Sequence, residues 1–460
     1  MHVHIIGICG TFMAGLGILA REKGYKVTGS DARFLPPMSI QLKNQDIVLY
    51  QGFDVHPTLE EPDIWVIGNV ATRGMPLVEQ ILAKNKNYTS GPDFLAKELI
   101  KDRCIIGIAG THGKTTVASL ITWFLESNGL NPGYLIGGMP LNFKASARLG
   151  STNSPFVVEA DEYDTAFFDK RSKFLHFKAK YVLLNNLEFD HADIFSDLTD
   201  IKKQFHHWIR TLSKETKIFS NRESKALNDV IKQGMWSKIN YFNDLSELYF
   251  REVSNSKKNC FDIFKEKKKL GMVNSPLIGV HNMSNVTGAY YLANEFGIDI
   301  EKINQYLENF KGVKRRLEQK ADLKGVKVFD DFAHHPTAVR ETINAFKKNM
   351  LVQDDDVINK KLIVVFEPRS NSMKLGSMKK DLSLAFDGVD YLFVYSKGIE
   401  WDAEAILDNL KARLTVSVSI EKISNQLYSM VDKGDSVIFM SNGSFDGLVD
   451  SFVARLANKS

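Results

Sequence analysis

The run Gly110-Thr111-His112-Gly113-Lys114-Thr115-Thr116 has the residue types of a loop that binds nucleotide phosphates. An apolar stretch over 104–109 predicts a strand before it, and 115–127 predicts a helix after it. Glycines let backbone N–H groups approach phosphate oxygens, and a helix N-terminus favours anions. We expect Lys114 to hold the β- and γ-phosphates and the Thr115 hydroxyl to bind Mg²⁺, although the first glycine departs from the general spacing.

Two further predicted strands end in acidic residues. Glu159-Ala160-Asp161-Glu162 closes a strand that begins at 156, and 186–191, which ends in Asp190-His191, follows a strand over 181–185. Because the carboxyl ends of parallel strands face the ligand crevice, both clusters should lie beside the phosphate loop. Carboxylate and imidazole groups there would suit Mg²⁺ that bridges phosphates, whereas the alternative is ordinary acidic loops and a surface histidine.

Polar side chains also open a later helix and end the strands of a third unit. His281, Asn282 and Asn285 lie in the first turns of a predicted helix, and from their spacing alone helix capping and adenine recognition are equally supported. In the third unit, Arg369 and Ser370 follow a predicted strand. Polar residues at the ends of such strands predict a substrate crevice there. Arg369 is suited to grip a carboxylate, although a lone arginine more often forms a surface ion pair.

The first predicted strand leads into a glycine turn that includes Gly10 and Thr11, and the second ends at Asp31. This arrangement could bind a dinucleotide, but the glycine spacing is G-x-x-G and departs from the nicotinamide fingerprint. It is a weak nicotinamide signal, and it is compatible with another diphosphate, such as a UDP-sugar. Asn69 and Arg73, which follow the third strand, are weaker candidates for the same ligand.

The chain has 460 residues, of which 44% are hydrophobic and 25% are charged, as is typical of soluble globular proteins. Its 59 basic and 55 acidic side chains give a net charge of +4, which implies no nucleic-acid partner. We interpret the lysine-rich stretch 257–269 as the solvated edge of a hairpin. Residues 3–20 are apolar but rich in glycine, so we interpret them as strand, turn and helix without membrane insertion. Three distant cysteines predict reduced thiols in a cytoplasmic protein.

Strand-like and helix-like patterns alternate along the whole chain and predict three α/β units. A short amphipathic stretch, 93–101, looks like a linker helix between the first two units. The alternation over 249–270 predicts antiparallel hairpins in the second unit. Residues 312–316 look like a hinge before the third unit.

Taken in order, these motifs resemble those of the Mur ligase family, the ATP-dependent amide-bond-forming enzymes of bacterial cell-wall synthesis. The resemblance covers essentially the whole chain. It rests on the phosphate loop, the two acidic strand ends, His281 with Asn282 and Asn285, Arg315, and 330–336. It implies an α/β fold of three domains: a Rossmann-like UDP-sugar-binding domain over 1–102, a P-loop-type central ATPase domain with a mixed sheet over 103–313, and a Rossmann-like peptide-binding domain over 314–460.

The resemblance also implies roles for single residues. The catalytic groups would be Lys114, Glu159, His191 and Arg315, with Arg315 reaching the γ-phosphate when the domains close. Mg²⁺ would be held by Thr115, Glu159 and His191, and one or two ions are possible. ATP would be bound by the phosphate loop together with His281, Asn282, Asn285, Arg315 and Asp330. The UDP-sugar would be bound by Gly10, Thr11, Asp31, Asn69 and Arg73, and the peptide by Arg369 and Ser370.

Within the family, the stretches 4–13, 159–174, 367–371 and 441–443 look like the murein peptide ligase branch. That branch joins UDP-N-acetylmuramate to the recycled tripeptide L-alanyl-γ-D-glutamyl-meso-diaminopimelate through an acyl phosphate. The alternatives are the ligase that adds L-alanine to the same sugar nucleotide, an ATP-binding regulatory protein without ligase activity, and a nicotinamide oxidoreductase. We expect a monomer or a weak homo-oligomer.

Overall fold

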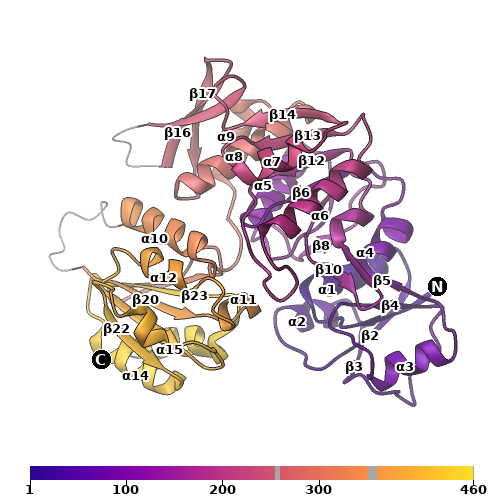
Figure 1. The fold of residues 1–460 in the computed structure, drawn as a ribbon, viewed down its shortest axis with the longest axis horizontal. Helices are drawn as coiled ribbons and strands as arrows, with labels where there is room; N and C mark the ends of the chain where they lie inside the picture. The colour runs from indigo at the N-terminus through magenta and orange to yellow at the C-terminus, as the bar shows by residue number, and fades with distance from the viewer. Residues whose placement is uncertain (254–258, 351–359, 459–460) are drawn as a thin grey trace.

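The computed structural model describes residues 1–253, 259–350 and 360–458. Three α/β units, each built on a sheet of its own, follow one another along the chain (Figure 1). In Figure 1 the N-terminal unit, drawn in indigo, and the C-terminal unit, drawn in orange and yellow, both lie below the central one. No helix among the described residues is long and apolar enough to cross a bilayer.

The N-terminal unit has a five-stranded, all-parallel sheet in the order β3-β2-β1-β4-β5. Its elements are β1 (His2–Ile6), α1 (Thr11–Glu22), β2 (Lys26–Asp31), α2 (Met38–Lys43), β3 (Val48–Gln51), β4 (Ile64–Ile67), α3 (Pro76–Ala83) and β5 (Tyr88–Ser90). The predicted linker helix is present in two parts, an α-turn α4 (Gly91–Phe94) and a π-helical turn η1 (Leu95–Leu99).

The central unit has a ten-stranded mixed sheet in the order β17-β16-β15-β14-β13-β12-β6-β9-β7-β8. Its inner strands pair in parallel, and β15 to β17 form the predicted antiparallel hairpins. Lys257 and Lys258 of the lysine-rich stretch lie outside the described residues, and Lys269 pairs with Asp262 at 2.8 Å.

The elements of the central unit are β6 (Ile105–Ala109), α5 (Lys114–Ser127), β7 (Gly133–Leu135), β8 (Ala147–Arg148), β9 (Phe156–Glu159), β10 (Asp164–Ala166), β11 (Asp169–Ser172), η2 (Lys173–His176), β12 (Tyr181–Leu184), α6 (Leu198–Thr211), β13 (Lys217–Asn221), α7 (Lys225–Lys232), β14 (Lys238–Phe242), β15 (Leu248–Glu252), β16 (Asn259–Lys265), β17 (Lys268–Ser275), α8 (Val280–Ala293), η3 (Asn294–Phe296) and α9 (Ile300–Glu308).

The C-terminal unit has a six-stranded sheet in the order β18-β19-β23-β20-β21-β22, in which only β18 is antiparallel to its neighbour. Its elements are β18 (Glu318–Leu323), β19 (Val326–Asp331), α10 (Pro336–Met350), β20 (Leu362–Glu367), α11 (Asn371–Lys374), α12 (Lys379–Ala385), β21 (Tyr391–Tyr395), α13 (Ala403–Leu407), β22 (Arg413–Ser417), α14 (Ile420–Met430), β23 (Ser436–Ser441), η4 (Phe445–Gly447) and α15 (Leu448–Ala457).

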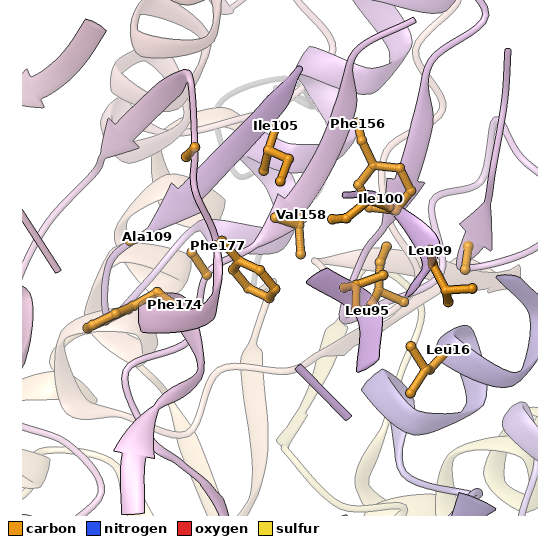
Figure 2. Packing of buried hydrophobic residues seen from close by; sticks show 14 of the residues in the cluster. Leu16, Leu95, Leu99, Ile100, Ile105, Ala109, Phe156, Val158, Phe174 and Phe177 are labelled. Carbon is orange, nitrogen blue, oxygen red and sulfur yellow. The ribbon is translucent and has the colours of Figure 1, made fainter. Parts of the chain in front are cut away.

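One hydrophobic core runs through the first two units, whereas the third has cores of its own. Figure 2 shows this continuity: Leu16 of α1 lies near Leu95 and Leu99 of the linker, which adjoin Phe156 and Val158 of β9 and its neighbours. The N-terminal and central units are therefore packed as one body. The third unit follows a hinge whose backbone turns sharply, with positive φ at Gly312, Arg315 and Leu317.

Candidate active site

A cavity of about 1400 Å³ lies where the three units meet, and residues of all three form its walls. The parallel strands bring their carboxyl ends to this edge, as is usual in open α/β sheets. Most of the predicted site residues line it: Thr11, Asn69, Thr111 to Thr116, Glu159, His191, His281, Asn282, Asn285, Arg369 and Ser370. The other predicted residues do not form its walls: Gly10, Asp31, Arg73, Gly110, Arg315 and Asp330.

The phosphate loop depends on glycine at its last turn. Gly113 precedes α5 with a φ of +77°, in the left-handed region. A Cβ at this position would lie 2.7 Å from Asn185 Nδ2 and 2.8 Å from Asn285 Oδ1, so packing also requires glycine. Asn186 fixes the same turn, because its side chain accepts a hydrogen bond from the His112 N–H at 2.8 Å and donates one to the His112 carbonyl at 3.0 Å. The N-terminus of α5 is thus held at the cavity, where it favours a phosphate.

Lys114, in the first turn of α5, is surrounded by the acids that follow β9. Its Nζ donates to the Gly110 carbonyl at 2.7 Å and to Glu162 Oε2 at 3.0 Å, and lies 3.6 Å from Asp161 Oδ1. Burial disfavours the charged lysine, but Glu162 and Asp161 outweigh this effect and raise the pKa of Lys114. Burial likewise disfavours the Glu162 carboxylate, but Lys114 and His191 hold its pKa well below the ordinary value. Lys114 is therefore fully charged and can exchange a carboxylate partner for a phosphate.

Thr115 and Glu159 form a pair of oxygen donors beside the loop. The Thr115 hydroxyl donates to Glu159 Oε2 at 3.2 Å, and the Gly137 N–H donates to the other carboxylate oxygen at 2.6 Å. Burial is the main cause that raises the pKa of Glu159 to about 7. His191 has a φ of +56° and its Nε2 lies 3.4 Å from Glu162. Thr115 and Glu159 thus offer the donor types that Mg²⁺ prefers, while His191 is paired with Glu162.

The residues at the start of α8 link this helix to the phosphate loop. The residue before α8 is Gly279, which has no side chain to cap it, so the capping interpretation does not apply to the first turn. Asn282 instead accepts a hydrogen bond from Asn285 Nδ2 at 3.0 Å, and Asn285 is buried. His281 Nδ1 lies 3.7 Å from Glu341 Oε2 of α10. These side chains join the central and C-terminal walls of the cavity at one end.

For two of the predicted nucleotide contacts, Arg315 and Asp330, the geometry favours the next residue along the chain. Arg315 Nε lies 3.2 Å from Asp330 Oδ2, and Arg315 Nη2 donates to the Ser441 carbonyl at 2.5 Å, so this pair is directed away from the cavity walls. The neighbouring Arg316 and Asp331 line the cavity instead. Successive side chains of a strand point to opposite faces, so only one of two adjacent aspartates at the end of β19 can face the cavity. Arg316 and Asp331 therefore replace Arg315 and Asp330 as the candidates.

The N-terminal wall contains fewer of the predicted residues than the sequence suggests. Thr11 and Asn69 line the cavity. Gly10 caps α1, and Asp31 accepts a backbone N–H of the same glycine turn at 2.8 Å, so its carboxylate braces the turn. Arg73 is exposed and forms a surface ion pair with a glutamate of α3 at 2.9 Å. The geometry thus supports Thr11 and Asn69 over Asp31 and Arg73 as direct ligand contacts.

The C-terminal wall presents Arg369 and Ser370 after β20. Arg369 Nη1 donates to Glu367 Oε1 at 3.1 Å and its side chain is 46% exposed, so it has donors available to a ligand. Ser370 is the N-cap of α11 and accepts the Met373 N–H at 3.3 Å. Asn442, on the same wall, has a buried Oδ1 that has no hydrogen-bond partner among the residues that the structure describes.

A second lysine, Lys173, lies behind the acidic cluster; it belongs to the stretch 159–174 that resembles the murein peptide ligase branch, but the sequence predicts no role for it. Its Nζ is 3.6 Å from Asp161 Oδ2, 4.0 Å from the centre of the Tyr163 ring and 4.8 Å from the centre of the Phe12 ring. Burial lowers the pKa of Lys173, and Asp161 opposes this effect. Because Phe12 belongs to the N-terminal unit, Lys173 ties that unit to the acidic cluster.

Comparison with known families and proteins agrees with this architecture. The model described as "Mur ligase family, catalytic domain" matches residues 2–103, "Mur ligase middle domain" matches 108–293, and "Mur ligase, glutamate ligase domain" matches 315–443. Proteins of Haemophilus influenzae and Escherichia coli, both named UDP-N-acetylmuramate–L-alanyl-γ-D-glutamyl-meso-2,6-diaminoheptandioate ligase, are 39% and 40% identical to this chain. The alignments cover 100% of this chain and 100% and 99% of the two relatives.

A crystal structure of a murein peptide ligase from Psychrobacter arcticus is also similar. It is 36% identical with a TM-score of 0.76, and the match covers 100% of this chain and 99% of that one. The predicted resemblance and the predicted three-domain α/β fold are both confirmed. The chain therefore belongs to the Mur ligase family.

Proposed function

We propose that this chain is an ATP-dependent ligase that joins UDP-N-acetylmuramate to L-alanyl-γ-D-glutamyl-meso-diaminopimelate and releases ADP and phosphate. The observation that carries the proposal is the three-sided cavity, in which a phosphate loop with a charged Lys114 faces an acidic cluster and Arg369. A ligase that joins two anionic substrates at the expense of ATP needs these three features in one place. The names of the two full-length relatives support the choice of sugar nucleotide and tripeptide.

The reaction requires activation of a carboxylate, which is a poor electrophile. An oxygen of the lactoyl carboxylate attacks the γ-phosphorus of ATP, and the acyl phosphate forms as ADP leaves. Lys114, the N-terminus of α5 and Arg316 supply positive charge where negative charge builds up on the phosphoryl oxygens. The amine of the tripeptide then attacks the acyl carbon, a C–N bond forms, and phosphate leaves as the nitrogen loses its proton.

Each substrate has a candidate wall of the cavity. Thr11 and Asn69 contact the UDP-sugar, Arg369 and Ser370 anchor the carboxylates of the peptide, and the nucleoside part of ATP is bound by His281, Asn282, Asn285 and Asp331. Mg²⁺ would be held by Thr115 and Glu159, with His191 as a further ligand, and when bound it neutralises charge on the phosphate oxygens.

The same proposal covers location and partners. The described cysteines, Cys9, Cys104 and Cys260, are all free, which supports a reducing cytoplasmic location. We infer a monomer or weak homo-oligomer without a nucleic-acid partner.

An assay of phosphate release tests the proposal. The protein is supplied with ATP, Mg²⁺ and UDP-N-acetylmuramate, and free L-alanine is compared with the tripeptide as the acceptor. Release with the tripeptide alone is expected. Release with L-alanine would place the chain among the L-alanine ligases instead. No release with either acceptor, in a protein shown to bind ATP, would favour a regulatory protein that lacks ligase activity.

A further inference from the structure

We propose that His112, Glu188 and His335 form a second metal site, which binds Zn²⁺ or a similar borderline cation between the central and C-terminal units. It shares no residue with the Mg²⁺ position at Thr115 and Glu159. The candidate ligand atoms of the three side chains all lie within 4.8 Å of one another. This site goes beyond the proposed ligase reaction and does not depend on it.

Glu188 stands at the centre of the cluster. Its Oε2 is 3.5 Å from His112 Nε2 and 3.8 Å from His335 Nδ1, and the two imidazole rings are 4.4 Å apart between their centres. Ligand atoms around a tetrahedral Zn²⁺ are about 3.3 Å apart, given Zn–N and Zn–O bonds of about 2.0–2.1 Å. Small rotations of the side chains would therefore bring all three atoms to coordinating distance.

His112 provides an independent observation. Its Nε2 is buried and forms no hydrogen bond of good geometry within the described structure, and its contact with Glu188 Oε2 is long, at 3.5 Å. A buried ring nitrogen with only such a long contact is better satisfied by a ligand. The backbone of His112 is fixed by Asn186 at 2.8 Å, so the ring is presented from a rigid turn.

His335 and Glu188 are already oriented by neighbouring groups. His335 Nε2 is 3.1 Å from the Phe189 carbonyl, so this nitrogen donates and Nδ1 keeps the lone pair that faces Glu188. The Thr337 hydroxyl donates to Glu188 Oε2 at 2.7 Å and so orients the carboxylate. The Thr337 N–H donates to His335 Nδ1 at 3.2 Å, and an ion bound at Nδ1 would replace this hydrogen bond. Such outer contacts orient ligands in protein metal sites.

The donor set selects the kind of ion. Two imidazole nitrogens and one carboxylate suit Zn²⁺, whereas Mg²⁺ prefers oxygen ligands alone. All three residues line the cavity, so a fourth position is open to water or a phosphate oxygen. His112 and Glu188 belong to the central unit and His335 to the C-terminal unit, so the ion would hold the two units together. Zn²⁺ binding is therefore expected to restrict domain opening.

Two titrations of the metal-free full-length protein test the site. In the first, Co²⁺ is added and its visible absorption is followed. In the second, the protein competes with a chromogenic chelator for Zn²⁺. We expect one Zn²⁺ to bind outside the Mg²⁺ position, and His335→Ala and Glu188→Gln each to weaken it at least about tenfold. His334→Ala is the matched control, because His334 neighbours His335 and is not among the clustered ligands. His191→Ala is the control for the Mg²⁺ position and should retain the ion.

Loss of Zn²⁺ affinity in His191→Ala, with no change in His335→Ala, would assign the ion to the Mg²⁺ position and overturn the proposal. Equal affinity in the wild type, His335→Ala and Glu188→Gln would also overturn it. Calorimetric unfolding shows whether each variant is folded. Small-angle scattering provides a second measurement: Zn²⁺ should reduce the radius of gyration of the wild type but not that of Glu188→Gln.

Discussion

Ser372 Oγ donates a hydrogen bond to Asp190 Oδ1 at 3.1 Å, and this bond joins the C-terminal unit to the loop that contains His191. The same Oγ accepts the Ala192 N–H at 2.9 Å, so the residues on both sides of His191 are held by one buried hydroxyl. Asn371 adds a hydrogen bond to Asp193 at 2.8 Å. Because the C-terminal unit has cores of its own, its docking position sets the geometry of this loop.

We expect Ser372→Ala to lower the rate of ligation roughly tenfold. The Asp190 carboxylate and the Ala192 N–H would lose their hydrogen-bond partner, and leaving buried polar groups unpaired costs about 1–3 kcal/mol. Ser377→Ala, an exposed change in the same segment, is the matched control and should have little effect. Steady-state kinetics under saturating ATP measure the difference. A Ser372→Ala enzyme as active as the control would show that the bond does not position His191.

Lys114→Met should reduce ligation by at least about 100-fold, because the charge that stabilises the transferring phosphoryl group is lost. It should also destabilise the protein by about 3 kcal/mol, since the buried Glu162 carboxylate loses its 3.0 Å partner. Lys203→Met removes an exposed lysine with an ion pair at 3.1 Å and is the control. Assays of phosphate release and calorimetric unfolding measure the two effects, and an unchanged rate would contradict the assigned role.

Glu159 should make the metal-free protein less stable as the pH rises. Its pKa is about 7 in the folded protein, above the ordinary value of 4.5, so the folded state binds the proton more tightly. Stability should therefore fall as the pH rises from about 4.5 to about 7, by up to about 3 kcal/mol. Glu159→Gln removes this titration. Calorimetry should therefore show that the stability of Glu159→Gln relative to the wild type is greater at about pH 8 than at about pH 5. A difference that does not depend on pH would contradict the raised pKa.

Arg316 and Arg315 offer a matched pair of neighbours. Arg316→Ala should impair ATP-dependent turnover by about tenfold or more, because its side chain lines the cavity. Arg315→Ala should impair it less, since Asp330 and the Ser441 carbonyl hold that guanidinium. Values of kcat and KM for ATP decide between them, and the reverse order would restore Arg315 as the contact.

Much of the site could be predicted because its chemistry is encoded by short local motifs. The phosphate loop needs a strand, glycines and a helix in immediate succession, and β6, Gly113 and α5 occur where the pattern placed them. The acidic ends of β9 and β12 follow from strand polarity in a parallel sheet. The order of the family motifs along the chain then predicts the three-domain fold.

The predicted residues that the cavity geometry does not favour have a different physical origin. Whether Asp330 or Asp331 faces the cavity depends on the pleat phase of β19, which two adjacent aspartates do not reveal. The choice between Arg315 and Arg316 depends on the hinge geometry that turns Arg315 toward Asp330, and the sequence does not reveal this geometry. The contacts of Lys173 and Ser372 cross unit boundaries, so they depend on how separately folded units dock.

Transfer of oxygen-18 from the substrate to phosphate tests the central claim most directly. UDP-N-acetylmuramate labelled in both oxygens of the lactoyl carboxylate is incubated with ATP, Mg²⁺ and the tripeptide, and the released phosphate is analysed by mass spectrometry. If an acyl phosphate forms and the tripeptide amine displaces it, the phosphate carries one labelled oxygen and the UDP-N-acetylmuramoyl tripeptide retains the other. Unlabelled phosphate, or labelled phosphate that appears with L-alanine but not with the tripeptide, would contradict the account.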